Sequence, residues 1–468
     1  MSRDDGYAQV LEAASRHARE YLAGLRERPV AQRADAEELR AALDRDLPEA
    51  GEDPAAVVEE LARAAEPGVI ATGGPRYFGF VIGGALPAAL GADWLASAWD
   101  QIPGLYVCGP SATVAEEVAG RWVLDLLGLP KSAGFGLTTG GTMANFTGIA
   151  AGRHAVLERG GWDVEADGLQ GAPPVRVLVG EHAHASVFLS LRMLGLGERT
   201  AVRVRADEAG RMLPAKLTAE LERGEGRAIV CAQAGEVNTG CFDPLEEIAD
   251  ACRERGAWLH VDGAIGLWVA ASSKLSHLTR GLDRADSWST DAHKWLNVPY
   301  DCGFVAVADE DVLRSSMGLS AAYLTRSELR DGFEYVPESS RRARGLALYA
   351  ALRSLGRQGV RDLVERCCEL ARLMGAELDA DPRLELLNEV AINQVLVALR
   401  DPVDESGELT AAAIERIQGD GTCWLAGTTW RGRPAIRVSI SNWQTSEEDV
   451  RRSATAIRDA VRVTAESG

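Results

Sequence analysis

The chain has 468 residues, roughly three times the size of a ~150-residue domain, so one compact core with one or two smaller accessory domains is expected. Its 46% hydrophobic and 25% charged residues exclude wholesale disorder and a collagen-like repeat. Because 69 acidic residues face 50 basic ones, the net charge of −19 argues against nucleic acid and anionic lipid surfaces as partners.

Residues 1–70 are rich in Ala, Glu, Leu and Arg, which predicts two or three helices interrupted at Pro29, Pro48 and Pro54. The apolar positions of such helices, for example Val10 and Leu11, need another surface to cover them. In a chain of this size that surface is often a second subunit. We therefore expect residues 1–70 to form a helical dimerisation segment.

The first twenty residues carry many charges and no apolar core, so no signal peptide is predicted. The 8 cysteines are scattered without a CxxC pair, which predicts neither a zinc site nor a disulfide framework and favours a reducing cytoplasm. The longest uncharged apolar stretch, 78–92, is shorter than the ~18 residues that a membrane span needs. We expect it to be buried core or a wall near a ligand, where Gly83 and Gly84 let the backbone approach closely.

Residues 71–345 have the pattern of a large α/β domain. A helical stretch opens at 109–111 and stops at 128–130, and strand and helix patterns alternate after it. Five short β-branched runs, hydrophobic on both faces, predict a mainly parallel sheet covered by helices. They lie at 175–179, 228–232, 258–262, 286–290 and 304–308. Residues 346–468 are helical at first and then strand-like at 390–399 and 435–443, with a final helix from about 446, which predicts a small α+β domain.

The first candidate catalytic residue is Lys294, which follows His293 directly after a predicted strand. A lysine is usually a solvated surface charge. This one is flanked by Trp295, Leu296 and Val298. An apolar pocket lowers the pKa of an amine and keeps a neutral nucleophile available, which is the condition for a Schiff base with an aldehyde.

Asp262 ends the predicted strand 258–262, where a side chain points into the ligand crevice of a parallel sheet. Taken alone, it is as readily a helix N-cap. A pyridoxal cofactor needs an acidic partner for its ring nitrogen, however, and Ala264 nearby is small enough to leave room for a flat ring.

The segment 137–146 is a Gly-rich turn that leads into a helix. Free backbone N–H groups at the helix start, together with the Thr142 hydroxyl, can bind an anion. The turn is neither a GxGxxG nor a Walker motif, so its weight comes from its coexistence with Lys294 and Asp262.

Two interpretations compete for His182 and His184, which follow the predicted strand 175–179. In the first, the HxH pair ligates a metal in a metal-dependent hydrolase. In the second, His184 places a flat imidazole over a cofactor ring and His182 is incidental. The metal interpretation leaves Lys294 and the Gly-rich turn unexplained.

With these motifs in order, the chain resembles the pyridoxal-phosphate-dependent group II amino-acid decarboxylases, the family of aromatic-amino-acid and glutamate decarboxylases. The resemblance runs from PRYFGF near 75 through TGGTMAN, HAHAS, VNTGCFDPL, HVDGA and DAHKW to SRRARGLALY near 349. It implies pyridoxal 5'-phosphate as cofactor and an α/β fold of the aspartate-aminotransferase type (fold type I). It also implies a homodimer with active sites at the subunit interface.

The resemblance also implies a role for each matching residue. Lys294 would hold the cofactor covalently, Asp262 would pair with the ring nitrogen, and His184 would stack on the ring. The other implied contacts are Gly141, Thr142 and His293 at the phosphate, Ala264 beneath the ring, and Asn238 near the ring hydroxyl.

Two departures from the family pattern remain. Glu236 stands where the family usually has threonine, which adds a carboxylate near the substrate region. The family also uses a loop tyrosine to protonate the carbanion, and this chain offers Tyr323 and Tyr335 without a clean alignment to either.

The expected reaction is decarboxylation of an L-amino acid to an amine and carbon dioxide. Transamination and decarboxylation coupled to oxidative deamination use the same cofactor and stay open, as does the metal-dependent hydrolase using His182 and His184. An apolar and aromatic set of residues resembles the family's pocket walls and favours a neutral or aromatic substrate side chain. This set is Phe80, Ile82, Ile102 and Tyr106.

Overall fold

The computed structural model describes residues 3–224, 227–319, 329–400 and 404–467, so Tyr323 lies outside the described residues. The helices are α1 (Arg3–Gly24), α2 (Ala36–Leu43), α3 (Pro54–Ala65), α4 (Pro87–Trp99), α5 (Pro110–Leu126), α6 (Gly141–Glu158), α7 (Val164–Asp167), α8 (Ala185–Met193), α9 (Pro214–Arg223), α10 (Leu245–Arg255), α11 (Glu310–Met317), α12 (Arg344–Asp379), α13 (Glu408–Asp420) and α14 (Glu447–Ser467). The strands are β1 (Gly134–Thr138), β2 (Val175–Gly180), β3 (Val202–Val204), β4 (Arg227–Gln233), β5 (Trp258–Asp262), β6 (Ser287–Asp291), β7 (Gly303–Val307), β8 (Leu384–Leu386), β9 (Gln394–Leu399), β10 (Ala426–Trp430) and β11 (Arg433–Ser439).

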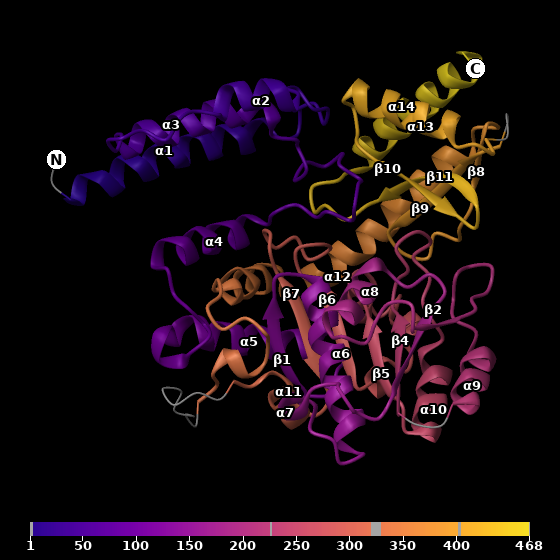
Figure 1. The fold of residues 1–468 in the computed structure, drawn as a ribbon. Helices are drawn as coiled ribbons and strands as arrows, with labels where there is room; N and C mark the ends of the chain where they lie inside the picture. The colour runs from indigo at the N-terminus through magenta and orange to yellow at the C-terminus, as the bar shows by residue number, and fades with distance from the viewer. Residues whose placement is uncertain (1–2, 225–226, 320–328, 401–403, 468) are drawn as a thin grey trace.

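Seven strands form the central sheet in the order β1-β7-β6-β5-β4-β2-β3 (Figure 1). The pairs from β6 through β5, β4 and β2 to β3 are parallel, and β7 runs antiparallel to both of its neighbours. All five predicted strands are confirmed to within one or two residues, whereas β1 and β3 were not predicted. The mainly parallel sheet is confirmed as well.

Helices cover both faces of this sheet, as the two-sided hydrophobic strands require. Along β2, Val177 and Val179 pack with Ile149 of α6 in one buried cluster. Leu178, which points the other way, packs with Leu217 of α9 and Ile248 of α10 in a second cluster. The alternation along one strand therefore assigns α6 to one face and α9 and α10 to the other.

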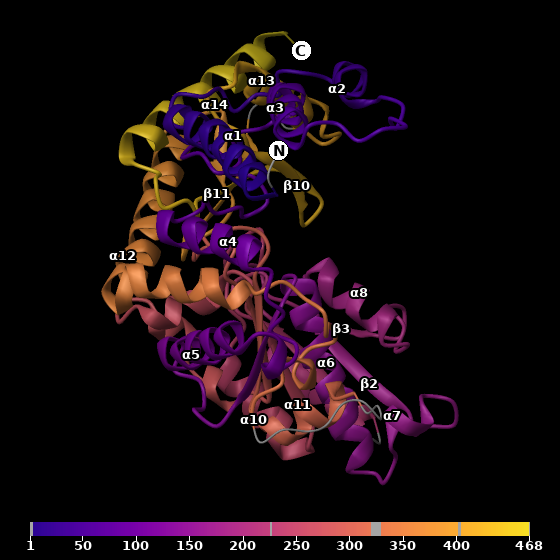
Figure 2. The same ribbon diagram turned by 90° about the vertical axis from the view of Figure 1, so that its left-hand side faces the viewer.

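A second sheet of four antiparallel strands, in the order β10-β11-β9-β8, lies beyond the carboxyl ends of the parallel strands (Figure 1). The long helix α12 connects the two sheets and runs along one side of the molecule (Figure 2). It bends at Gly356, whose φ of 61° interrupts the helical conformation. The predicted boundary at residue 345 falls at the start of α12, and the three-domain division stays a prediction.

The N-terminal helices α1, α2 and α3 pack on one another and stand apart from the central sheet (Figures 1 and 2). The predicted helix breaks at Pro29 and Pro48 are confirmed, because both residues lie between helices. Pro54 instead is the first residue of α3, a position where proline favours a helix. Several large apolar side chains are exposed on these helices: Tyr7, Leu11, Leu22, Leu43, Val57 and Leu61. No helix among the described residues is long and apolar enough to cross a membrane.

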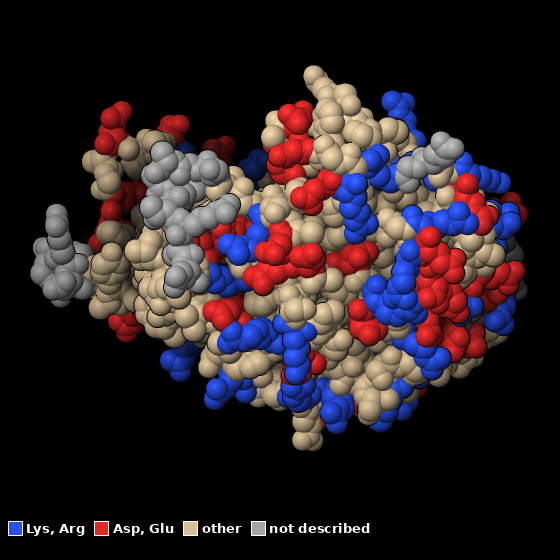
Figure 3. Space-filling model, turned by 90° about the horizontal axis from the view of Figure 1, so that it is seen from below, with Lys and Arg blue, Asp and Glu red and all other residues tan. Residues whose placement is uncertain are grey.

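The acidic excess does not form one continuous patch on the face seen from below, where basic and acidic side chains are interspersed (Figure 3). Ion pairs such as Arg255 with Glu222, at 2.6 Å, connect α10 to α9. Exposed pairs of this kind contribute little to stability.

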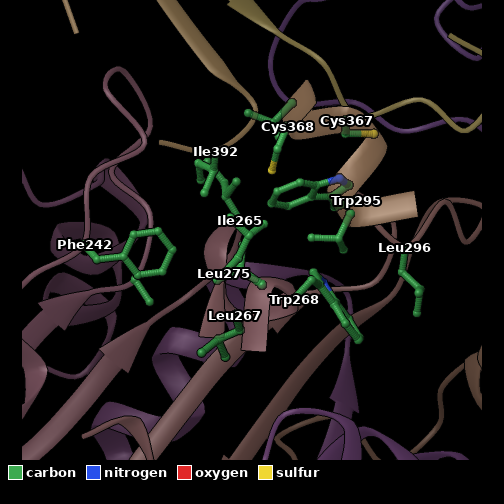
Figure 4. Close-up of a cluster of buried hydrophobic side chains, with 14 of the residues drawn as sticks. Phe242, Ile265, Leu267, Trp268, Leu275, Trp295, Leu296, Cys367, Cys368 and Ile392 are labelled. Carbon is green, nitrogen blue, oxygen red and sulfur yellow. The ribbon is translucent and has the colours of Figure 1, made fainter. Parts of the chain in front are cut away.

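The segment that follows Lys294 is anchored in the core. Trp295 and Leu296 are 1% and 2% exposed. Figure 4 shows Trp295 between Trp268 and the Cys367 and Cys368 side chains of α12. Because large buried side chains resist displacement, this packing fixes the backbone from which Lys294 projects.

Candidate active site

The predicted site residues lie where strands of the central sheet end. Asp262 is the last residue of β5, and Lys294 follows β6 by three residues. His184 follows β2, and the Gly-rich turn follows β1. Because β1, β2, β5 and β6 run in the same direction, their carboxyl ends meet at one edge of the sheet.

A cavity of about 300 Å³ opens at this edge. Six of the predicted site residues line it: Gly141, Thr142, His184, Ala264, His293 and Lys294. Sequence reasoning missed the other lining residues, which are Thr139, Gly140, Met143, Ser186, Asp291 and Tyr300. Asp262 lies beside Ala264 and is 5% exposed.

Lys294 is held by an unexpected partner. Its Nζ lies 2.9 Å from Oδ2 of Asp291, and its side chain is 19% exposed. The other carboxylate oxygen of Asp291 is buried and has no hydrogen-bond partner. The signal was present in the sequence, because Asp291 stands three residues before the lysine in the DAHK motif.

His293 is fixed beside the Gly-rich turn. Its Nδ1 accepts a hydrogen bond from the Cys302 backbone N–H at 3.0 Å, so the neutral ring carries its proton on Nε2. Burial lowers the pKa of His293. Tyr300 packs on the imidazole with the ring centroids 4.3 Å apart.

The Gly-rich turn requires its glycines. Gly140 has φ 143°, a conformation that is essentially restricted to glycine. A Cβ on Gly140 would lie 3.1 Å from Cε1 of His293, and one on Gly141 would lie 2.7 Å from Oδ2 of Asp291. The turn therefore leaves an open cradle at the start of α6, whose first N–H groups have no partner within the helix.

Asp262 lies behind the lining residue Ala264 and is held by two hydrogen bonds. Its Oδ2 accepts a hydrogen bond from Nδ2 of Asn145 at 2.9 Å, and its Oδ1 accepts one from the Ala264 backbone N–H at 3.1 Å. Each carboxylate oxygen keeps a further lone pair, so the group can still accept a proton-bearing ring nitrogen.

His184 lines the cavity and caps α8. Its Nδ1 accepts from the Ser186 backbone N–H at 3.2 Å and lies 2.8 Å from the Ser186 hydroxyl. Burial lowers the pKa of His184, and the positive charges of Lys294 and Arg437 lower it further. The imidazole is therefore neutral near pH 7, with its proton on Nε2.

These residues fit pyridoxal phosphate. The cradle at Gly140 and Gly141 offers backbone N–H groups to a phosphate, Lys294 offers an amine to an aldehyde, and Asp262 offers a carboxylate to a ring nitrogen. The carboxylate of Asp291 is unusual beside a phosphate, but it is matched by Lys294 at 2.9 Å.

Asn238 and Glu236, which were singled out from the sequence, do not line the cavity. The Asn238 amide donates to Oε1 of Glu236 at 2.8 Å and accepts from the Thr428 hydroxyl at 2.9 Å, and Asn238 does not line the cavity. Its role near the ring hydroxyl stays a prediction. Glu236 is 1% exposed, and its Oε2 accepts from the backbone N–H groups of Asn238 and Thr239. Its carboxylate thus stabilises its own turn.

Tyr335 is placed as a structural residue. Its hydroxyl donates to Oε1 of Glu310 at 2.5 Å, and its ring lies 3.6 Å from the Arg330 guanidinium. It does not line the cavity, so this geometry does not support it as the proton donor.

His182 and His184 diverge. The ring of His182 packs against Trp430, with the centroids 4.6 Å apart, while His184 bonds to Ser186. Among the described residues, no three His, Cys, Asp or Glu side chains are grouped to hold a metal ion. The geometry of the HxH pair therefore does not favour the hydrolase interpretation.

Arg437, in β11, was not identified from the sequence. Its charge acts on His184 and on Glu236, and burial lowers its pKa. Its Nε is buried without a hydrogen-bond partner. A half-buried guanidinium with an unused donor, close enough to affect the pKa of His184, is suited to bind a carboxylate.

The fold and the residues of this cavity fit an α/β enzyme with an aldehyde cofactor. The model of the pyridoxal-dependent decarboxylase conserved domain matches residues 36–400. The chain is 28% identical over 444 residues to an aromatic-L-amino-acid decarboxylase of Bacillus atrophaeus, covering 92% of this chain and 90% of that protein. It is 30% identical over 428 residues to an L-2,4-diaminobutyrate decarboxylase of Rhizobium meliloti, covering 89% and 84%.

Solved structures show the same fold. Mouse CSAD superimposes with a TM-score of 0.91 at 24% identity, covering 98% of this chain and 99% of that one. Oryza sativa TDC, solved with PLP and tryptamine, also gives 0.91, at 23% identity and 99% coverage of both chains.

The chain belongs to the pyridoxal-dependent decarboxylase family. It is a lyase that decarboxylates an amino acid with pyridoxal phosphate as its cofactor, which confirms the predicted activity and cofactor. The predicted fold class is confirmed as well.

Proposed function

We propose that Lys294, Asp262 and His184 are the catalytic residues of this decarboxylase. The observation that carries the proposal is that Lys294 and His184, which follow two strand ends, line one cavity, while Asp262 at a third strand end contacts the lining residue Ala264. When bound, pyridoxal phosphate supplies an electrophilic aldehyde and a ring that accepts the electron pair left by carbon dioxide.

Each side chain has its own task in this proposal. Lys294 provides the amine that holds the cofactor. Asp262 would offer its carboxylate to the ring nitrogen, where a negative charge favours a proton. His184 would contact the ring and present its Nε2 proton to the cavity, while Gly141, Thr142 and His293 would bind the phosphate.

We further propose that Arg437 binds the substrate carboxylate and that the substrate side chain is uncharged. Two positive groups act on His184, namely Lys294 and Arg437. Lys294 is committed to the cofactor, so Arg437 remains for the carboxylate that every amino acid carries. Met143 and Tyr300 in the cavity wall suit a neutral or aromatic side chain.

A panel of aromatic, aliphatic, acidic and basic amino acids tests this proposal, with carbon dioxide and amine measured as products. We expect an uncharged substrate to give the highest kcat/KM, and preference for an acidic substrate would contradict the proposal.

Arg437→Gln should raise KM roughly 30-fold or more, because it removes the charged partner of a buried carboxylate. Arg431→Gln, an exposed position on the same hairpin, is the matched control.

The partner subunit in this proposal is a second copy of the chain. Large apolar side chains stay exposed on α1–α4 and on the segment that follows α4, including Trp94, Trp99, Ile102 and Val107. Phe80, expected in a pocket wall, is also 58% exposed. Patches of this kind indicate protein interfaces. Light scattering should give a dimer for the wild type, and Trp99→Glu should weaken it; a monomeric wild type would refute the assignment.

The proposed cytoplasmic location is supported by the cysteines. All eight are free thiols. Reduced thiols are the normal state in a reducing compartment.

A further inference from the structure

Asn145 lies in α6 beneath the active site and is fully buried. Every hydrogen-bonding position of its side-chain amide is occupied. Nδ2 donates to Oδ2 of Asp262 at 2.9 Å and to Oγ of Ser186 at 3.0 Å. Oδ1 accepts from Nε2 of His260 at 2.9 Å and from the Ser289 hydroxyl.

The chemistry of the partners fixes the direction of these bonds. An ionised Asp262 can only accept, so the amide nitrogen of Asn145 must face it. The amide oxygen then faces His260, which must donate from Nε2. Nδ1 of His260 lies 2.9 Å from the Ser287 hydroxyl, which can donate to it. Burial lowers the pKa of His260 to about 4, in keeping with a neutral ring.

A second chain of hydrogen bonds runs from Asn145 through Ser186 to His184, which lines the cavity. Because Ser186 Oγ accepts from Asn145, its own proton is free to point to Nδ1 of His184, 2.8 Å away. The Ser186 backbone N–H donates to the same nitrogen. The Asn145 amide therefore contacts the Asp262 carboxylate directly and the His184 imidazole through the Ser186 hydroxyl.

We propose that Asn145 is a positioning residue for the decarboxylation: its two N–H donors hold the Asp262 carboxylate in place and, through Ser186, orient His184 with its proton toward the cavity. This inference rests on the proposed roles of Asp262 and His184. The alternative is that Asn145 only anchors α6 to β5 and β6.

Asn145→Asp separates these possibilities, because it keeps the size and the two acceptor contacts but replaces both donors. Two carboxylates then lie about 2.9 Å apart and must share a proton, so Asp262 presents less charge to the ring nitrogen. We expect kcat to fall by roughly 10- to 100-fold, as for other residues that orient active-site groups, with KM little changed. The pH profile of kcat should gain a titration that the wild type lacks.

The cofactor-free protein gives an independent readout. The shared proton raises the pKa of one carboxyl above its unfolded value of roughly 4, so the variant folds with more bound protons than the wild type. Its melting temperature should therefore lie closest to that of the wild type at acidic pH and fall behind as pH rises. The double variant N145D/D262N restores a donor facing a carboxylate. It should recover the melting temperature while kcat stays low.

Asn393→Asp is the matched control. Asn393 is also fully buried and donates to the Ile440 carbonyl oxygen at 3.1 Å and to Ser441 at 3.0 Å, but it does not line the cavity. This variant should lose stability while each folded molecule keeps wild-type kcat and pH profile. Should Asn145→Asp not fold, Ser186→Ala tests the branch to His184. A fall in kcat supports the proposal, and wild-type kcat overturns that branch.

Asp262→Asn, measured in parallel, distinguishes a failure of the proposed function from a failure of the inference about Asn145. If it retains wild-type kcat, the proposed function fails. If it is inactive while Asn145→Asp behaves like Asn393→Asp, the inference about Asn145 alone is overturned.

Discussion

Gly83 supports the backbone of Lys294, and replacing it with alanine should damage catalysis from outside the cavity. A Cβ at position 83 would lie 2.0 Å from the Lys294 carbonyl oxygen, whereas real Cβ atoms essentially never come within 3.0 Å. The backbone must therefore move by about 1 Å. A misplacement of that size can cost roughly 10²-fold in rate. Overpacking should also cost about 1–3 kcal/mol of stability.

The assay measures kcat at saturating pyridoxal phosphate together with thermal unfolding. Gly419→Ala is the matched control, because Gly419 is an exposed residue of α13 with nothing within 4 Å of the new Cβ. It should raise stability by up to about 1 kcal/mol and leave kcat unchanged. Wild-type kcat and melting temperature for Gly83→Ala would refute the reasoning.

Two further predictions concern residues outside the cavity. Tyr335→Phe should keep kcat per folded molecule but lose about 1 kcal/mol or more of stability, because the Glu310 carboxylate loses its hydroxyl donor. A large fall in kcat without unfolding would contradict this prediction. The Glu165 carboxylate raises the pKa of His154, so their pair stabilises the fold fully below roughly pH 6.5 and loses that contribution as pH rises through the raised pKa. The melting-temperature gap between wild type and Glu165→Gln should therefore shrink from about pH 6 to about pH 9, and a constant gap would contradict it.

The sequence predicted the elements whose signals are local. The strand β5, with Asp262 at its end, was predicted with its observed bounds because Trp258, Leu259 and Val261 are apolar and the run ends in a polar residue. The strands β1 and β3 were missed: β1 contains two glycines in five residues, and β3 has only three residues. Both owe their strand conformation to pairing with a neighbour in the sheet.

For the candidate site, the sequence indicated residues with distinctive chemistry and missed those that act through position. Lys294, His184 and the Gly-rich turn stand in recognisable motifs and converge on the cavity. Asn145 lies within a quoted motif, but its hydrogen bonds join α6 to residues more than a hundred positions away. Arg437 lies in a different sheet, and a linear pattern does not show that its Nε is buried without a hydrogen-bond partner.

The central claim is that Lys294 carries the cofactor. Reduction of the pyridoxal-phosphate-loaded protein with borohydride, followed by peptide mass spectrometry, tests it most directly. We predict one stable adduct, on the peptide that contains Lys294 and absent from Lys294→Ala. An adduct on another lysine, or none at full cofactor loading, would contradict the account.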